Sequence, residues 1–129
     1  MKFKYTILYV KDVKTTLEFY EQAFGMAQKM LSDDGGYGEL DTGDTSLAFA
    51  SLDAINEMIA SKSPMQANPK TPVFEIAFET DDVSAALAKA VQAGATMVQE
   101  ATKMPWGQTV GYVSDPDGFL IELCTEVNP

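Results

Sequence analysis

The chain of 129 residues contains 46% apolar and 22% charged residues, a composition typical of folded globular proteins and not of disordered or fibrous ones. Its length suits one compact unit or two small fused modules. Nineteen acidic and nine basic residues give a net charge of −10, which argues against nucleic acid as a partner. Such a charge attracts a cationic ligand, and the alternative is that it serves only solubility.

The absence of several residue types and segments narrows the function classes further. No apolar run is long enough to span a membrane, and no apolar stretch typical of a secretory signal follows the first residues. The single cysteine, Cys124, has no partner for an internal disulfide, so we expect a cytoplasmic protein. The chain has no histidine, which excludes Ser-His-Asp and Cys-His triads and HExxH zinc sites.

An internal repeat appears at an offset of 70 residues, where the segment that begins at Tyr5 aligns with the segment that begins at Glu75. Each copy is predicted to form a strand, an aspartate cap and a helix, because apolar residues recur at helical spacing after the aspartate. Asp12 and Asp82 are the predicted caps, since a carboxylate at this position accepts hydrogen bonds from the first free N–H groups of a helix.

Short strands and turns are predicted after each helix. The predicted strands are 35–40 and 46–51 in the first copy and 96–100, 108–114 and 119–126 in the second. A short helix is predicted over 52–60, and residues 115–118 (Asp-Pro-Asp-Gly) have the composition of a turn. The Ser- and Pro-rich residues 61–72 indicate a linker, which predicts two βαβββ modules at 1–60 and 73–129.

These elements predict an α+β fold in which the mixed sheets of the two modules form an open trough that suits a ligand. Alternation along the first strand places Leu8 and Val10 under a helix and Tyr5 on the trough side. The same reasoning places Glu75 and Glu122 on the trough side. The alternative is that these are solvated faces of ordinary strands.

The paired modules, the Pro105-Trp-Gly107 segment and the Asp115-Pro-Asp-Gly-Phe-Leu-Ile-Glu-Leu123 ending resemble the vicinal oxygen chelate superfamily. This superfamily includes glyoxalase I, extradiol dioxygenases, fosfomycin-resistance enzymes and bleomycin-resistance binding proteins, and the resemblance covers nearly the whole chain. Its metal-using members place a His or Glu early in each first strand and a Glu in each last strand. The corresponding positions here are Tyr5, Ala48, Glu75 and Glu122.

The resemblance, with these departures, implies a site that uses neither a metal nor another cofactor. Ala48 has no donor atom, and zinc, iron or nickel sites of this kind need three or four ligands that include imidazoles. We therefore expect Glu75 and Glu122 to form an acidic pair, with one raised pKa, that binds a cation. The predicted ligand-binding residues are Tyr5, Tyr37, Ala48, Phe49, Glu75, Met104, Trp106, Tyr112 and Glu122.

The favoured function is metal-independent binding or sequestration of a small cationic or aromatic molecule, as in antibiotic or toxin resistance. We expect a homodimer, because exposed sheet edges need cover. The alternative is a glyoxalase-like lyase or isomerase, with or without a divalent metal, in which Glu75 or Glu122 is the general base and Tyr5 donates a proton. A metal-assisted glyoxalase or dioxygenase activity is a third possibility, which the missing ligands disfavour.

Overall fold

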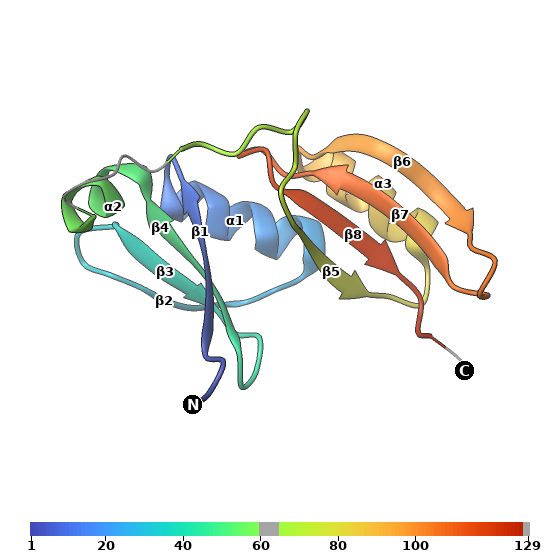
Figure 1. Ribbon diagram of the computed structural model, residues 1–129, viewed down its shortest axis with the longest axis horizontal. Coiled ribbons are helices and arrows are strands. Elements are labelled where there is room, and N and C mark those ends of the chain that lie inside the picture. Colours follow the sequence, from blue (N-terminus) through green and yellow to red (C-terminus); the bar gives the residue numbers. More distant parts are fainter. Residues whose placement is uncertain (60–64, 128–129) are drawn as a thin grey trace. The chain divides into compact units, whose positions relative to one another are not determined.

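The computed structural model describes residues 1–59 and 65–127. The chain divides into two compact units, Met1–Gln66 and Ala67–Pro129. This division falls within the predicted linker, of which residues 61–64 lie outside the described residues. Each unit contains one four-stranded mixed sheet (Figure 1). The predicted trough concerns both units together and stays a prediction.

The first unit is a βαβββ module with a short extra helix. Its elements are β1 (Tyr5–Val10), α1 (Val13–Phe24), β2 (Gln28–Leu31), β3 (Tyr37–Leu40), β4 (Ser46–Ser51) and α2 (Leu52–Met58). The strands lie in the order β1-β4-β3-β2, with β1 parallel to β4 and the other neighbours antiparallel. The helix predicted over 52–60 is thus present over Leu52–Met58, and Ala60 lies outside the described residues.

The second unit repeats the same topology without the extra helix. Its elements are β5 (Glu75–Glu79), α3 (Val83–Ala93), β6 (Thr96–Lys103), β7 (Thr109–Ser114) and β8 (Leu120–Cys124). The order β5-β8-β7-β6 has β5 parallel to β8, as β1 is to β4. Two βαβββ modules in an α+β fold are therefore confirmed. The strand β2 was not predicted, and β6 extends three residues beyond its predicted end.

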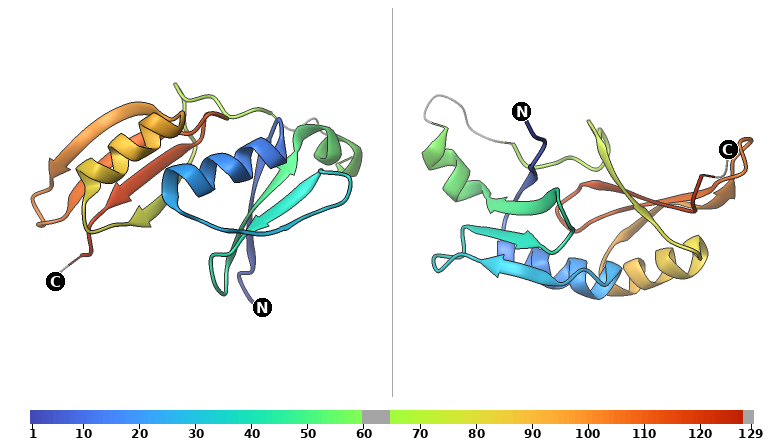
Figure 2. Two further views of the ribbon diagram at one scale, coloured as in Figure 1. Left: turned by 180° about the vertical axis from the view of Figure 1, so that it is seen from behind. Right: turned by 90° about the horizontal axis from the view of Figure 1, so that it is seen from below.

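The two long helices begin where the sequence predicts. Asp12 accepts a hydrogen bond from the backbone N–H of Thr15 at 3.1 Å, and Asp82 accepts one from that of Ala85 at 3.0 Å. These bonds satisfy donors that have no partner within the helix. Each helix lies across one face of the sheet of its own unit (Figure 2). The caps therefore fix the point from which each helix covers its sheet.

Alternation along β1 separates a buried face from an exposed one, as predicted. Leu8 and Val10 are 1% and 0% exposed, whereas Tyr5 and Ile7 are 48% and 42% exposed. The buried face packs under α1, because apolar surface removed from water stabilises the fold. The same separation recurs in β8, where Ile121 is buried and its neighbours on the other face are partly exposed.

The helices approach their sheets closely at one glycine in each unit. A Cβ added to Gly38 on β3 would lie 2.8 Å from Leu17 Cδ1 on α1. A Cβ added to Gly111 on β7 would lie 2.5 Å from Leu87 Cδ1 on α3. Both distances are shorter than carbon–carbon packing allows, so only glycine lets these leucines pack directly on the sheet.

No helix in the described part of the chain is long and apolar enough to cross a membrane.

Candidate functional site

The strand registers show which positions of the two modules correspond. In the first sheet Ile7 on β1 lies opposite Ala48 on β4, and in the second sheet Ala77 on β5 lies opposite Glu122 on β8. The repeat aligns Ile7 with Ala77, so Ala48 and Glu122 occupy matching positions. This register is the one inferred from the sequence. One module therefore carries a carboxyl group where the other carries a methyl group.

Two glutamates meet on the second sheet, on the face opposite the buried Ile121. Glu75 on β5 and Glu122 on β8 place their carboxyl groups within hydrogen-bonding contact, and we call them the acidic pair. The hydroxyl of Tyr112, which lies opposite Glu122 on β7, donates a hydrogen bond to Glu122 Oε1 at 3.0 Å. Three of the predicted site residues are thus brought together.

The electrostatics of the acidic pair favour the protonated form of Glu75. Burial raises the pKa of Glu75, and the hydrogen bond to Glu122 and its negative charge raise it further. Burial, followed by the hydrogen bond and charge of Glu122 and the charge of Glu75, raises the pKa of Tyr112 to about 12. The tyrosine therefore stays a neutral hydrogen-bond donor near neutral pH.

Cys124 borders the acidic pair but is not an activated nucleophile. Burial raises the pKa of its thiol, and a hydrogen bond to Glu122 and the charges of Glu122, Glu79 and Glu75 act in the same direction. The thiol donates a weak hydrogen bond to the backbone carbonyl of Phe78, with a sulfur–oxygen distance of 3.7 Å. A protonated, nearly buried thiol is a poor nucleophile, so Cys124 contributes packing.

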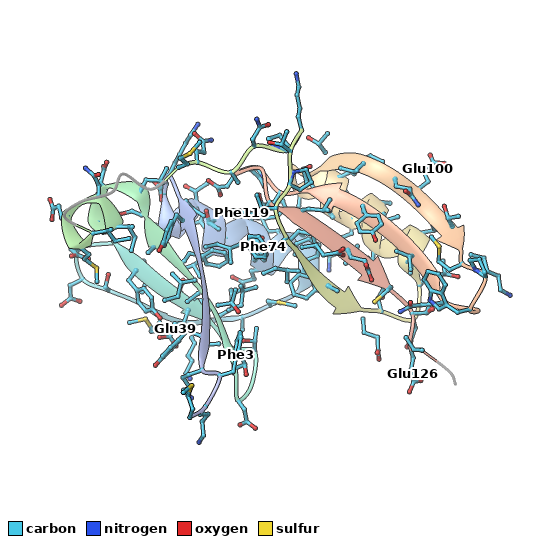
Figure 3. All side chains as sticks on the ribbon, in the orientation of Figure 1. Phe3, Glu39, Phe74, Glu100, Phe119 and Glu126 are labelled. Atoms are coloured by element: carbon cyan, nitrogen blue, oxygen red, sulfur yellow. The ribbon has the colours of Figure 1, made fainter. Side chains whose placement is uncertain are left out.

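On the face of the first sheet that corresponds to the face of the acidic pair, Tyr37 interacts with Glu39 and Tyr5. The Tyr37 hydroxyl donates a hydrogen bond to Glu39 Oε2 at 2.9 Å. Burial raises the pKa of Tyr37, and Glu39 and Tyr5 raise it further by hydrogen bonding and charge. Glu39, labelled in Figure 3, was missed from the sequence, although alternation within β3 places it on the same face as Tyr37. Ala48 lies opposite Glu39 in the sheet and is fully buried.

Phe49 does not lie where its predicted role requires. Its ring packs against Tyr20 on α1, with the ring centroids 4.9 Å apart, and its side chain is fully buried. It lies opposite Leu8, which also faces the helix. The prediction that Phe49 offers a free ring face to a ligand is therefore wrong, because it faces the core and not the open side of the sheet.

Met104 and Trp106 lie in the turn between β6 and β7. The backbone N–H of Gly107 donates to the carbonyl of Met104 at 2.9 Å, and that of Met104 donates to the carbonyl of Gln108 at 2.7 Å. Trp106 is 60% exposed, and its indole Nε1 donates to Gln108 Oε1 at 2.9 Å. Gln108 was not among the predicted site residues, because its contact with Trp106 cannot be read from the sequence.

The donor atoms at the four family positions do not fit a zinc, iron or nickel ion. The chain has no imidazole, and Ala48 offers no donor. Within residues 1–59 and 65–127, no three Cys, Asp or Glu side chains are grouped so that they could hold a metal. The acidic pair alone supplies two carboxylates. Function without a metal stays a prediction.

Comparison with known proteins agrees with this architecture. The chain is 30% identical over 132 residues to a lactoylglutathione lyase of Escherichia coli O157:H7, covering 98% of this chain and 93% of the relative. It is 31% identical to a lactoylglutathione lyase of Neisseria meningitidis serogroup A, covering 95% of this chain and 89% of the relative.

Solved structures share the fold. A glyoxalase/bleomycin resistance protein/dioxygenase family enzyme from Burkholderia phytofirmans PsJN has a TM-score of 0.84 at 22% identity, covering 99% of this chain and 100% of that chain. A glyoxalase-related enzyme from Fulvimarina pelagi also has a TM-score of 0.84, at 20% identity, covering 98% of this chain and 88% of that chain. The family model of the Glyoxalase/Bleomycin resistance protein/Dioxygenase superfamily matches residues 2–123, and the chain belongs to this superfamily.

Proposed function

We propose that the protein binds a small cationic molecule with an aromatic part, without a metal, and that the acidic pair neutralises the cation. One observation carries this proposal: Glu75 and Glu122 hold their carboxyl groups in contact on the face of the second sheet opposite Ile121, in a chain without histidine. Two carboxyl groups this close repel each other when both are ionised.

A bound cation relieves that repulsion. An ammonium or iminium group between the carboxylates takes the place of the proton on Glu75 and forms charge-assisted hydrogen bonds. The Tyr112 hydroxyl continues to donate to Glu122 and keeps that carboxylate in position. The net charge of −10 adds a longer-range attraction for cations. Affinity for a cation should therefore rise with pH as the pair loses its proton.

Three probes separate charge from ring shape in a calorimetric titration near neutral pH. Ethidium is a planar cation, hexylammonium is a cation without a ring, and phenanthridine is the uncharged parent ring of ethidium. We expect both cations to bind and phenanthridine to bind much more weakly. Failure of both cations to bind the wild-type protein would contradict the proposal.

Matched variants then test the acidic pair itself. Glu75→Gln and Glu122→Gln each remove one charge with little change in shape, and each should weaken ethidium binding about tenfold or more, the effect of one charge-assisted hydrogen bond. Glu100→Gln is the control, because Glu100 lies on β6, at the opposite edge of the sheet from β5 (Figure 3). An equal loss in all three variants would mean that only net charge matters.

In the same proposal, the bound molecule is sequestered unchanged, as in antibiotic or toxin resistance of the bleomycin type, by a homodimer in the cytoplasm. The bleomycin resistance proteins that share the family model support this, and the single cysteine agrees with a reducing compartment. Recovery of intact ligand after incubation tests sequestration. Light scattering coupled to gel filtration tests the dimer, and a monomer at working concentration would refute it.

A second candidate is a lyase or isomerase activity, which is supported by the lactoylglutathione lyases at about 30% identity and by the raised pKa of Glu75. A carboxylate with a raised pKa is a stronger base, and Glu75 would take a proton from one carbon of the substrate and return it to the next. Such an isomerisation needs no oxidant. Formation of lactoylglutathione from methylglyoxal and glutathione, with chelator or with added divalent metal, tests it. Activity that Glu75→Gln abolishes would replace sequestration as the function.

A further inference from the structure

Trp106 combines high exposure with a fixed position. It is the only tryptophan of the chain and is 60% exposed. Its indole Nε1 nevertheless donates a hydrogen bond of 2.9 Å to Gln108 Oε1, two residues along the chain. A ring that is mostly in water gains little from burial, so packing within its own unit does not explain why it is held.

Gln108 is itself anchored to the end of the neighbouring strand. Its Nε2 donates a hydrogen bond of 2.8 Å to the backbone carbonyl of Thr125, which follows β8 directly. One end of the amide therefore binds the indole and the other end binds the sheet. This fixes which end of the amide is oxygen and which is nitrogen, because the indole can only donate and the carbonyl can only accept.

The backbone of the turn adds a second restraint. Two hydrogen bonds between the backbones of Met104, Gly107 and Gln108 close the turn, and Gly107 has a φ of 98°, which a residue with a Cβ rarely adopts. Trp106 is thus held through its backbone by the turn and through its side chain by Gln108. Ordering a side chain in advance lowers the cost of binding a partner to it.

The surroundings of the turn indicate a ligand with both a ring and a positive charge. Thr125 lies three residues beyond Glu122, about 10 Å along an extended chain. Glu79 on β5 lies opposite Cys124, the residue before Thr125. The end of the sheet that holds Trp106 thus lies beside Glu79, with Glu122 three residues further along β8. Indole is the aromatic side chain best suited to contact a planar cation.

We infer that Gln108 is a positioning residue that holds the Trp106 indole as a preformed stacking surface for the planar aromatic part of the bound cation. The inference that a planar cation stacks on the indole rests on the proposed function. The inference that Gln108 restrains the indole does not. Gln108 acts through Trp106 and need not touch the ligand.

Because Trp106 is the only tryptophan, its fluorescence anisotropy reports the motion of this one ring. Gln108→Leu removes both side-chain hydrogen bonds with little change in size, and the anisotropy of the free protein should fall. Thr125→Val is the matched control. It removes the bond from the Thr109 N–H to Thr125 Oγ1 but keeps the carbonyl that Gln108 uses, so the anisotropy should stay at the wild-type value. Unchanged anisotropy in Gln108→Leu would overturn the inference.

Titration with two cations tests the stacking surface. Gln108→Leu should weaken ethidium about two- to tenfold, the cost of ordering one side chain at binding, and should leave hexylammonium unchanged. Gln108→Glu, which keeps the acceptor for the indole, should recover part of the anisotropy. Equal ethidium affinity in wild type and Gln108→Leu would overturn the stacking role while the proposed function stands. If neither cation binds the wild-type protein, the proposed function and the stacking role fail together, and the anisotropy still decides whether Gln108 restrains Trp106.

Discussion

The close approach of α3 to its sheet at Gly111 gives a stability prediction with a worked magnitude. In Gly111→Ala the new methyl group would lie 2.5 Å from Leu87 Cδ1 and 3.2 Å from Val83 Cγ1. Carbon atoms pack at about 3.5–4.0 Å, so Leu87 or the whole helix must move by about 1 Å. Overpacking of this kind costs about 1–3 kcal/mol, and the reduced freedom of the unfolded chain offsets about 0.4–1 kcal/mol. The difference spans about 0–2.6 kcal/mol, and because the contact of 2.5 Å is far inside packing distance we expect a net loss of about 1–2 kcal/mol.

Thermal and urea unfolding, followed by circular dichroism, measure this loss. At about 4 °C for each kcal/mol, the Tm should fall by about 4–8 °C. Gly38→Ala offers the matching test in the first unit, because its methyl group would lie 2.8 Å from Leu17 Cδ1 and 2.9 Å from Val13 Cγ1. A similar fall in that variant would show that the same contact supports both modules.

A double-mutant cycle with Leu87→Ala isolates the steric cause. Leu87→Ala alone should cost about 2–5 kcal/mol, because Leu87 is 2% exposed and its loss leaves a cavity beside Gly111. In that background the methyl group of Gly111→Ala has room, and it should cost little or even restore stability. If the two losses simply add, to within about 0.5 kcal/mol, the clash with Leu87 is not the cause and the reasoning is refuted.

Three further predictions concern the acidic pair and a helix cap. The folded protein raises the pKa of Glu75, so the stability gained from its proton is present below the ordinary pKa of 4.5 and is lost as pH rises through the folded pKa. The Tm of Glu75→Gln minus that of the wild type should therefore increase with pH. A Tm difference that does not change with pH would contradict this. Glu122→Gln removes the charge beside Tyr112, so the pKa of Tyr112 should fall from about 12 toward 10, and more tyrosinate should absorb at about pH 11 than in wild type. Asp82→Ala should cost about 1 kcal/mol in urea unfolding through loss of the cap, while Asp81→Ala, with the same loss of charge, should cost much less.

The elements with strong local signals could be predicted from the sequence. Both long helices begin at a capping aspartate and carry an apolar stripe, and β1 alternates between buried and exposed residues. These patterns depend on neighbours within a few residues, so one sequence suffices to read them. The strand β2 lacks such a pattern, because its residues are mostly exposed and its register shifts between Gln28 and Met30.

The positions of the glutamates could be predicted from strand alternation and from the internal repeat. Alternation placed Glu75 and Glu122 on one face, the superposition of the two last strands matched Glu122 with Ala48, and the strand registers agree. Phe49 was misplaced because β4 is buried on both faces and has no alternation from which to choose a side. The contact of Gln108 with Trp106 depends on side-chain geometry that spacing does not reveal.

The division into two units has a consequence for the synthesis of the protein. Within the described part of the chain, all four strands of the first sheet and the helix that covers them lie within Met1–Gln66. Its hydrophobic core can therefore close while the ribosome is still adding the second half, since domains fold as units in order of synthesis. A nascent chain stalled only after residues 1–66 have all left the ribosome would then already resist proteolysis.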